Sequence, residues 1–426
     1  MGERCRLRGC RRVHGDRGGD GSRARAGNQE QETRGGLCVT RDVVVVGGGV
    51  AAHRCALELR RLGHDGTVTV ISGERHPPYD RTFLSKDMLV EDVDLVPLAP
   101  RSEYTDQGIE LLLDVTAVAL DADARRVQLS DDTARRYDSL VLCVGGRPVL
   151  PPALDAPGVA VMREATHLDR LRAILARGGQ LVVIGGGFIG GEVASAAVTR
   201  GLDVTLVEQA GAPLEAMLGA EVGTRVAALH RERGVKVVTG VGARAVSASQ
   251  SGYRVDLDDG TTLSADAVVV GVGMAPATDW LTGSGLELDH GIVTDASCRT
   301  SVDSVFAAGD CARWWHPAYE SLCRVEHWDT AGRHGTAVAK TVLGSAEPFM
   351  PLPFVWSDQH GVKLQWAGRA AGWDDVRVEG DDPARFVARY YRSGQLIGVF
   401  VSGQPREFAK ARKELAASMC PPDQGR

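Results

Sequence analysis

Two stretches of the chain share an arrangement of residues that suits binding of a phosphate-containing cofactor. Residues 42–52 read DVVVVGGGVAA and residues 181–191 read LVVIGGGFIGG, so in both an apolar run leads into a glycine triplet. An acidic residue follows each stretch behind a second apolar run, Glu74 in the first case and Glu208 in the second. This order matches the G-x-G-x-x-G/A fingerprint of dinucleotide binding, in which an acid about 20 residues further on accepts from ribose hydroxyls. One copy is weak support, but two copies predict two dinucleotide sites.

The positions within each fingerprint have separate physical tasks. The first glycine makes the tight turn between strand and helix, the second lets the backbone approach the pyrophosphate, and the third small residue allows close packing of helix on strand. The phosphate would lie at the helix N-terminus, where unpaired N–H groups and the helix dipole favour an anion. The predicted cofactor contacts of the first copy are Gly47, Gly48, Gly49, Val50 and Ala51, with Ala52 as the packing residue. Those of the second copy are Gly185, Gly187, Phe188, Ile189 and Gly190.

The second acid also bears on which nicotinamide nucleotide is used. Glu208 would repel the 2′-phosphate of NADPH, and no Arg or Lys follows it in the stretch QAGAPLEAM. Sites for NADP usually have an Arg near this position to accommodate that phosphate. The sequence therefore favours NADH over NADPH.

Three later segments indicate that one of the two dinucleotides is a flavin. Residues 134–148 and 265–276 are apolar strands that end in glycine turns, and both look like crossover strands linking two nucleotide-binding domains. The segment SVFAAGDCA places Asp310 after a strand and a small-residue turn, where a carboxylate can hold the ribityl hydroxyls of FAD. We therefore predict FAD together with a nicotinamide nucleotide. The cofactor contacts predicted in these segments are Gly271, Gly273, Gly309 and Asp310.

Composition and charge exclude several other classes of protein. The chain has 426 residues, of which 43% are apolar and 24% charged, as in ordinary globular proteins. No stretch approaches the roughly 18 uninterrupted apolar residues of a membrane helix. Residues 1–41 hold ten Arg and five acidic residues, a net charge of +5, which leaves −11 for the rest of a chain with a total charge of −6. An acidic body with a short basic arm is not typical of a nucleic-acid binder, and no His or Cys spacing predicts a metal site.

The cysteines and the N-terminal region bear on the cellular compartment. Nine cysteines occur without a C-x-x-C pair, which favours free thiols in the reducing cytoplasm. Residues 1–40 have few apolar residues and no apolar run after Arg11 and Arg12, so we expect a disordered extension rather than a signal peptide. A wrongly assigned start codon and a basic arm with its own partner are the alternative explanations for this region.

Longer motifs resemble the FAD-dependent NAD(P)H:ferredoxin reductases of oxygenase systems, which belong to the pyridine nucleotide-disulfide oxidoreductase superfamily. The resemblance runs from about Asp42 to Leu415, nearly the whole body of the chain. It rests on PPYDRTFLSKDML at 77–89, GGGFIGGEVA at 185–194, VEHWDTA at 325–331, FVWSDQ at 354–359 and the hairpin YYRSGQLIGVFVSGQPREF at 390–408.

The resemblance implies an α/β fold with two doubly wound Rossmann-like dinucleotide-binding domains and a small C-terminal α/β domain. The NAD domain, residues 151–270, would be inserted in an FAD domain with two parts, residues 41–150 and 271–345. A C-terminal domain of the dimerisation or ferredoxin-interface type would cover residues 346–417, and a disordered tail would follow at residues 418–426.

The resemblance also assigns roles to individual residues. Lys86 would pair with Glu192 near flavin N5, and we take this pair as the catalytic one. Glu74 would hold the adenosine ribose of FAD, while Asp310 and Trp328 would contact the ribityl chain and the ring. The other FAD contacts that we expect are Arg81, Val115, Arg163 and the flavin-adjacent His327. Departures from the family pattern are Thr82 and Phe83 in place of two prolines, Ala216 in place of an Arg, and Gln404 in place of an Asn.

The activity that the resemblance implies is electron transfer. Hydride would pass from NADH to the flavin, and single electrons would then pass to a small acidic [2Fe–2S] ferredoxin that serves a P450 monooxygenase or a ring-hydroxylating dioxygenase. A helix beginning near Trp328 would direct its positive end toward charge that develops on the flavin. Six basic residues of the C-terminal region either receive the ferredoxin or form a solvated face: Arg389, Arg392, Arg406, Lys410, Arg412 and Lys413.

Two other functions remain open on the residues alone. An NADH oxidase or peroxidase shares both fingerprints, but enzymes of that kind place a cysteine where this chain has Lys86. A flavoprotein sensor of the apoptosis-inducing-factor type also shares them, and only turnover with a ferredoxin separates a sensor from a reductase. Neither nucleic acid nor a membrane is an expected partner, and we expect a monomer or a homodimer.

Overall fold

The computed structural model describes residues 42–91, 93–250, 252–369 and 371–419. The extension predicted at residues 1–40 lies outside the described residues, and so does the predicted tail from residue 420 onward. Residues 418 and 419, which we placed in that tail, instead form the last turn of a helix. Among the described helices, none combines the length and the apolar character needed to cross a bilayer.

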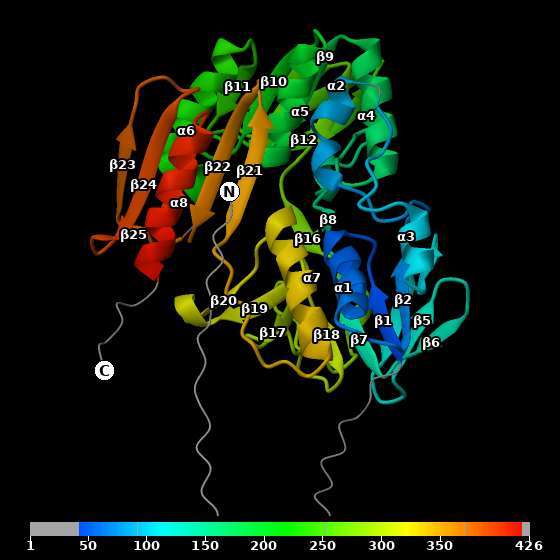
Figure 1. Ribbon diagram of the computed structural model, residues 1–426. Coiled ribbons are helices and arrows are strands. Elements are labelled where there is room, and N and C mark those ends of the chain that lie inside the picture. The colour runs from blue at the N-terminus through cyan, green and yellow to red at the C-terminus, as the bar shows by residue number, and fades with distance from the viewer. Residues whose placement is uncertain (1–41, 92, 251, 370, 420–426) are drawn as a thin grey trace, which may run out of the picture. The chain divides into compact units, whose positions relative to one another are not determined.

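Five parallel strands form the first sheet, in the order β18-β7-β1-β2-β3 (Figure 1). The residues of β1 alternate between two cores, because both faces of the sheet are covered. Val43 and Val45 pack with helices α1 (Val50–Arg61) and α7 (Trp328–Val342), whereas Val44 and Val46 face a β-meander. The strands of this sheet are β1 (Asp42–Val46), β2 (Thr67–Ser72), β3 (Ile109–Leu113), β7 (Ser139–Leu142) and β18 (Val305–Ala307).

Four parallel strands form the second sheet, in the order β11-β10-β9-β15. They are β9 (Gln180–Ile184), β10 (Asp203–Glu208), β11 (Lys236–Thr239) and β15 (Ala267–Val270). All of them lie in the sequence between β7 and β18 of the first sheet, which is the order expected for one nucleotide-binding unit inserted in another. The helices in this part of the chain are α4 (Ala165–Arg177), α5 (Phe188–Thr199) and α6 (Glu215–Glu232). The short helix α2 (Asp87–Val90) comes earlier in the sequence, between β2 and β3, and packs on α4 and α5.

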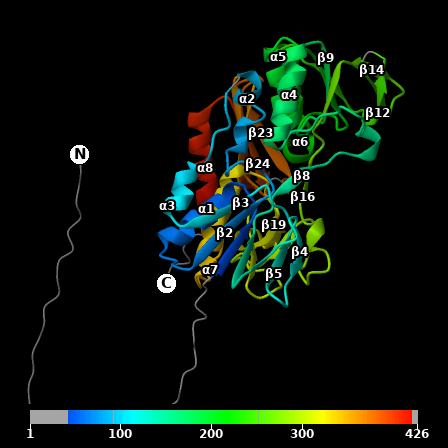
Figure 2. The same cartoon turned by 90° about the vertical axis from the view of Figure 1, so that its right-hand side faces the viewer.

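Each parallel sheet has its own three-stranded antiparallel meander (Figure 2). The first consists of β4 (Ala117–Asp121), β5 (Arg126–Leu129) and β6 (Ala134–Arg136), and the second of β12 (Ala243–Ser249), β13 (Gly252–Leu257) and β14 (Thr262–Ala265). The two segments predicted as crossovers pair with one another through β8 (Gly146–Pro148) and β16 (Met274–Pro276). The remaining elements near the first sheet are α3 (Arg101–Asp106), β17 (Ile292–Thr294), β19 (Ala312–His316) and β20 (Ser321–Cys323).

The last five strands of the chain form an antiparallel sheet, in the order β21-β22-β25-β24-β23. One face packs on α8 (Pro405–Met419), which lies across the sheet in Figure 1, and the other packs on α6 of the second unit. Together with the two parallel sheets, this sheet confirms the predicted α/β fold class with a small C-terminal domain. Its strands are β21 (Phe354–Gln359), β22 (Val362–Gly368), β23 (Asp375–Glu379), β24 (Phe386–Arg392) and β25 (Gln395–Ser402).

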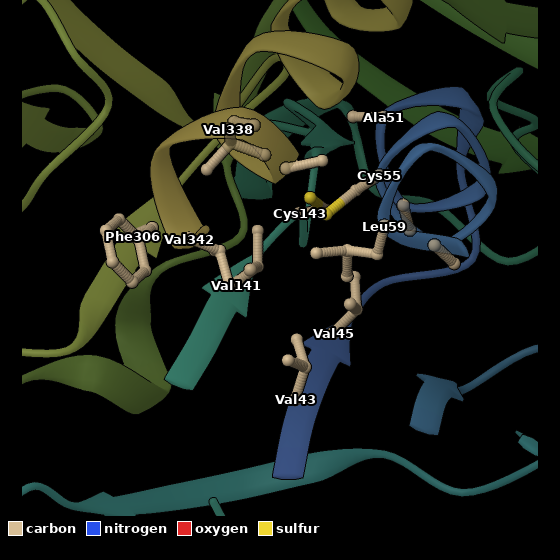
Figure 3. Packing of buried hydrophobic residues seen from close by; sticks show 14 of the residues in the cluster. Val43, Val45, Ala51, Cys55, Leu59, Val141, Cys143, Phe306, Val338 and Val342 are labelled. Carbon is tan, nitrogen blue, oxygen red and sulfur yellow. The ribbon is translucent and has the colours of Figure 1, made fainter. Parts of the chain in front are cut away.

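The core under the first glycine loop contains cysteine thiols rather than a disulfide. Cys55 and Cys143 point toward one another among valine side chains (Figure 3), and the five cysteines in the described residues are free. Burial raises the pKa of Cys55 to about 12 and that of Cys311 to about 11. The buried, apolar role predicted for Cys55 and Cys143 is confirmed, and Cys298 and Cys311 are buried too strongly to react as thiolates.

Candidate cofactor-binding and active site

A single cavity of about 1560 Å³ connects the two glycine loops and reaches the C-terminal sheet. Ligand pockets for one small molecule are usually about 300–1,000 Å³, so this volume suits two dinucleotides in contact. Most of the predicted contact residues line it. They are Gly49, Val50, Ala51, Arg81, Lys86, Arg163, Gly185, Gly187, Phe188, Ile189, Glu192, Glu208, Gly271, Gly273, Gly309, Asp310, His327 and Trp328.

Five predicted contacts do not line the cavity: Gly47, Gly48, Gly190, Glu74 and Val115. For four of them, close packing against neighbouring atoms explains why they do not reach the cavity. A Cβ on Gly47 would lie 2.0 Å from the carbonyl oxygen of Cys143, one on Gly48 would lie 2.2 Å from Oγ of Ser72, and one on Gly190 would lie 1.9 Å from the carbonyl oxygen of Gly185. Val115 packs instead against the core of the first sheet.

The glycine loops have the geometry of anion cradles. Gly47 and Gly185 adopt φ of +130° and +106°, which glycine tolerates and other residues rarely adopt. Gly49 and Gly187 immediately precede α1 and α5, and no side chain caps either helix. A Cβ on Gly49 would meet no atom within 4 Å, and one on Gly187 would reach only an atom at 4.0 Å. The open side of each loop, with its free N–H groups, therefore fits a pyrophosphate.

Three ion pairs join residues that we predicted as cofactor contacts. Glu74 pairs with Arg81 and also accepts from the Tyr79 hydroxyl at 2.6 Å. Because Arg81 lines the cavity and Glu74 does not, the predicted ribose contact of Glu74 stays a prediction. The other two pairs are Arg163 with Asp310, at 2.9 Å, and Lys86 with Glu192, at 3.0 Å.

The pair of Lys86 and Glu192 lies where three parts of the chain meet. Glu192 on α5 is 3% exposed, and its carboxylate accepts from the hydroxyls of Ser85 and of Ser357 on β21, the latter at 2.5 Å. Lys86 also donates to the carbonyl oxygen of Thr82 at 2.9 Å. The buried Glu192 carboxylate therefore has three donors from the protein itself, one of them a cation, which offsets the cost of its removal from water.

A chain of buried hydrogen bonds continues from Ser357 into the second unit, and the sequence did not predict it. Gln359 donates to Ser357 Oγ at 3.0 Å and its Oε1 lies 3.0 Å from Nε2 of His230. His230 in turn lies 2.9 Å from Nε2 of His360. The motif FVWSDQ contains both Ser357 and Gln359, but no local pattern relates them to His230 on α6.

The N-terminus of α7 contributes donors that have no partner among the described residues. The helix begins at Trp328, as predicted, and the Trp356 N–H donates to Nε2 of His327 at 3.1 Å. Burial lowers the pKa of His327 to about 4, so the ring is neutral. Nε2 lies 3.4 Å from the Trp356 carbonyl oxygen, and its shorter contact, as acceptor from the Trp356 N–H, assigns the ring proton to Nδ1. That Nδ1 and Nε1 of Trp328 are both buried without a hydrogen-bond partner in the described structure. Both residues line the cavity, which fits a bound ring with acceptor atoms.

The acid of the second fingerprint lies at the cavity wall. Oε2 of Glu208 accepts from the Gly186 N–H at 2.6 Å and Oε1 from the Ala210 N–H at 2.8 Å. Arg244 on β12 also lines the cavity. It lies far from Glu208 in the sequence, so the residues that directly follow Glu208 do not indicate it. Arg244 therefore brings a cation to the same cavity as Glu208.

Buried neutral histidines predict a loss of stability in weak acid. Burial lowers the pKa of His334 to about 3 and that of His230 to about 4, against 6.5 for the unfolded ring. Between pH 6.5 and 4 the unfolded chain therefore binds more protons than the folded chain. As the pH falls through this range, each such histidine should lower the free energy of unfolding by up to about 1.4 kcal/mol per pH unit. Urea unfolding at pH 6.5, 5.8 and 5.0 measures this slope. His334→Asn should reduce the slope, whereas substitution of the exposed His290 by Gln should not; a flat profile would contradict the prediction.

Two nucleotide-binding folds around one cavity define a flavoprotein oxidoreductase class. Residues 41–335 match the family described as pyridine nucleotide-disulphide oxidoreductase, and residues 354–425 match the one described as reductase C-terminal. The chain belongs to the pyridine nucleotide-disulphide oxidoreductase family.

Individual relatives are similar over most of their length. Rhodocoxin reductase of Rhodococcus erythropolis is 37% identical over 88% of this chain and 90% of its own. The ferredoxin–NAD(+) reductase component of the anthranilate 1,2-dioxygenase system of Burkholderia cepacia is 36% identical over 89% and 95%. The solved ferredoxin reductase for the CYP199A2 system of Rhodopseudomonas palustris has a TM-score of 0.84, with 33% identity over 88% of this chain and 94% of its own. The covalent complex of putidaredoxin reductase with putidaredoxin also gives a TM-score of 0.84, at 30% identity over 89% and 93%.

Proposed function

We propose that this chain is an NADH:ferredoxin reductase that uses FAD and passes electrons to a [2Fe–2S] ferredoxin of an oxygenase system. The observation that carries the proposal is the single cavity, because it places both glycine loops and the Lys86–Glu192 pair around one continuous space. Relatives that are similar over most of their length are named as reductases for ferredoxins of dioxygenase systems and of the CYP199A2 system. The downstream oxygenase of this chain would be of the P450 or the ring-hydroxylating dioxygenase type.

The first glycine loop would hold the pyrophosphate of FAD, and Asp310 its ribityl chain. Bound FAD would supply the change from two-electron transfer with NADH to one-electron transfer with the ferredoxin. His327 and Trp328 present buried N–H donors at the start of α7, where a helix dipole favours negative charge. Lys86 and Glu192 form an ion pair at the cavity wall, where Ser357 of β21 also donates to Glu192.

The second glycine loop would hold NADH, with Glu208 near its ribose. Ile189 and Val272 are 41% and 40% exposed at the cavity wall, and a bound nucleotide would cover this apolar surface. An apolar surface beside the nucleotide would help to exclude water from the space between the two cofactors.

The alternative functions lack support from the site. Position 86 is a lysine in an ion pair, whereas a peroxidase or oxidase of this fold would need a reactive cysteine there. Cys143 and Cys323 line the cavity, but burial raises the pKa of both thiols, so neither supplies a thiolate. The free thiols also favour a reducing compartment, and we place the enzyme in the cytoplasm.

The ferredoxin would dock on basic residues of the C-terminal domain. Two of the six predicted bases are already engaged within the domain. Arg389 lies 2.8 Å from Glu379, and the Arg412 guanidinium lies 4.9 Å from the centre of the Phe354 ring. The four that are exposed and available to an acidic partner are Arg392, Arg406, Lys410 and Lys413.

The assay that tests the proposal is reduction of cytochrome c by the purified flavoprotein with NADH. We expect addition of a [2Fe–2S] ferredoxin to stimulate the rate more than tenfold, because reduced flavin needs a one-electron carrier to reach cytochrome c. The same assay with NADPH should give a higher KM, since Glu208 repels a 2′-phosphate. Stimulation should fall as salt rises, because the proposed docking is electrostatic.

Two controls separate the proposed function from its rivals. Oxygen consumption and peroxide formation without ferredoxin should be slow; fast consumption would instead indicate an oxidase. A flavin that NADH bleaches but that no member of a panel of ferredoxins reoxidises would contradict the reductase proposal and favour a sensor.

A further inference from the structure

A short turn before the main part of α6 forms one wall of the cavity at the second glycine loop. We call it the 212–218 turn. The chain enters it at Leu214 with φ of +58°, and α6 is broken at Gly219, where φ is +79° and ψ 166°. Ala216, the position where the resemblance implies an Arg, lies in this turn, so no cation at that position can hold a nucleotide. The residues of the turn that line the cavity are Ala212, Leu214, Glu215, Ala216 and Met217.

One end of the 212–218 turn is bound to the second glycine loop. The Leu214 N–H donates to the carbonyl oxygen of Gly186 at 3.2 Å, and the Gly186 N–H donates to Glu208 at 2.6 Å. A Cβ on Gly186 would lie 3.2 Å from two carbon atoms of Pro213, so the turn lies directly on the loop. Movement of the turn therefore shifts Gly186 and, through it, the Glu208 carboxylate.

The other end of the turn is held by the C-terminal sheet. The hydroxyl of Tyr390, which is fully buried on β24, donates to the carbonyl oxygen of Leu218 at 2.8 Å, at the break in the helix. The Trp373 ring covers Gly219 so closely that a Cβ there would lie 2.8 Å from Cη2. The rings of Trp373 and Trp366 both pack edge to face against the Tyr390 ring, with ring centres 5.5 Å and 4.9 Å from its centre.

We propose that Tyr390 and Trp373 are positioning residues for NADH. Neither residue lines the cavity, but they hold the 212–218 turn against Gly186 and so keep the nucleotide-binding loop formed before NADH arrives. Such preorganisation raises affinity because less ordering remains to be done on binding. The inference rests on the proposed function in assigning NADH to the second glycine loop.

Tyr390→Phe tests the inference because it removes one hydroxyl and keeps the ring. Loss of one hydrogen bond of about 0.5–1.5 kcal/mol corresponds to a rise of roughly 2- to 13-fold in the dissociation constant. We expect this rise in the Kd for NAD⁺, measured by calorimetry, and in the KM for NADH. The kcat at saturating NADH, the flavin content and the KM for ferredoxin should stay within twofold. Amide hydrogen exchange of residues 214–218 should become faster.

A matched control and a second variant sharpen this test. Tyr391→Phe removes the hydroxyl of the neighbouring tyrosine, whose ring lies 4.5 Å from the Arg377 guanidinium and away from α6, and it should leave every value unchanged. Trp373→Ala opens the space over Gly219 and should raise the Kd for NAD⁺ at least as much as Tyr390→Phe.

Several outcomes would overturn the inference. One is an unchanged Kd for NAD⁺ and unchanged amide exchange in both variants. Another is loss of flavin and of kcat in step with the melting temperature, which would mean a purely structural role. Binding of NAD⁺ is measured without a ferredoxin, so failure of ferredoxin reduction by the wild-type chain leaves this test standing. A wild-type chain that does not bind NAD⁺ would overturn the inference itself.

Discussion

Gly49→Ala is expected to weaken FAD binding by roughly 5- to 150-fold while leaving the protein folded. Gly49 has φ of −94° and an extended backbone, which alanine adopts without strain. A Cβ there would meet no protein atom within 4 Å, so the free energy of unfolding of the flavin-free protein should change by less than about 1 kcal/mol. The methyl group would instead occupy the side of the loop where the pyrophosphate approaches. Overpacking of about 1–3 kcal/mol corresponds to a loss of roughly 5- to 150-fold in affinity.

Titration of the deflavinated protein with FAD, followed by flavin fluorescence, measures this effect. Gly187→Ala is the matched control in the second loop and should leave FAD binding unchanged while raising the KM for NADH. Gly63→Ala controls for backbone strain alone, because Gly63 has φ of +87° and open space around it. It should cost about 1 kcal/mol of stability without affecting either nucleotide. Normal FAD affinity in Gly49→Ala would mean that the first loop does not hold the flavin.

The second large effect is expected from Lys86→Met, which removes the cation beside a buried carboxylate. Glu192 is 3% exposed and would be left with only Ser85 and Ser357 as donors. Breaking a buried ion pair by removal of one partner typically costs about 3–5 kcal/mol, because the remaining charge is left uncompensated. We expect a loss of this size in the free energy of unfolding, measured by urea denaturation at a fixed excess of FAD.

The exposed pair of Lys363 and Asp358 provides the matched control. It lies at 2.7 Å with side chains 42% and 36% exposed, so Lys363→Met should cost less than about 1 kcal/mol. The double variant with Lys86→Met and Glu192→Gln should recover most of the lost stability, since no buried charge remains. Two results would contradict this prediction: a double variant that is as unstable as Lys86→Met alone, or Lys86→Met losing no more stability than Lys363→Met. Either would show that compensation of the Glu192 charge by Lys86 does not stabilise the fold.

Local patterns in the sequence determined a large part of the nucleotide-binding units. Each fingerprint combines an apolar strand, a tight glycine turn and a helix within about a dozen residues, and the physical demands on Gly47 and Gly185 are local ones. The positive φ at both positions and the start of α1 and α5 after Gly49 and Gly187 therefore agree with expectation. The number of dinucleotide sites, the start of α7 at Trp328 and the buried character of Cys55 were also accessible from the sequence.

Contacts between distant segments could be decided only by the tertiary structure. Ser357 and Gln359 on β21 connect Glu192 on α5 to His230 on α6 through hydrogen bonds, and no local pattern relates these three elements. Glu74 illustrates the same limit, because its side chain is turned to Arg81 and Tyr79 and does not line the cavity.

A fingerprint specifies the path of the backbone through local sterics, and the sequence alone therefore determined where both glycine loops lie and which helices they begin. The direction of a side chain and the identity of its partner depend on which surfaces pack together across hundreds of residues. Tyr390 donates to Leu218 only because the C-terminal sheet packs on α6, and Arg244 on β12 lines the cavity only because the second meander packs against the second parallel sheet. Packing free energy summed over those interfaces selects such contacts, and no stretch of a few residues contains that information.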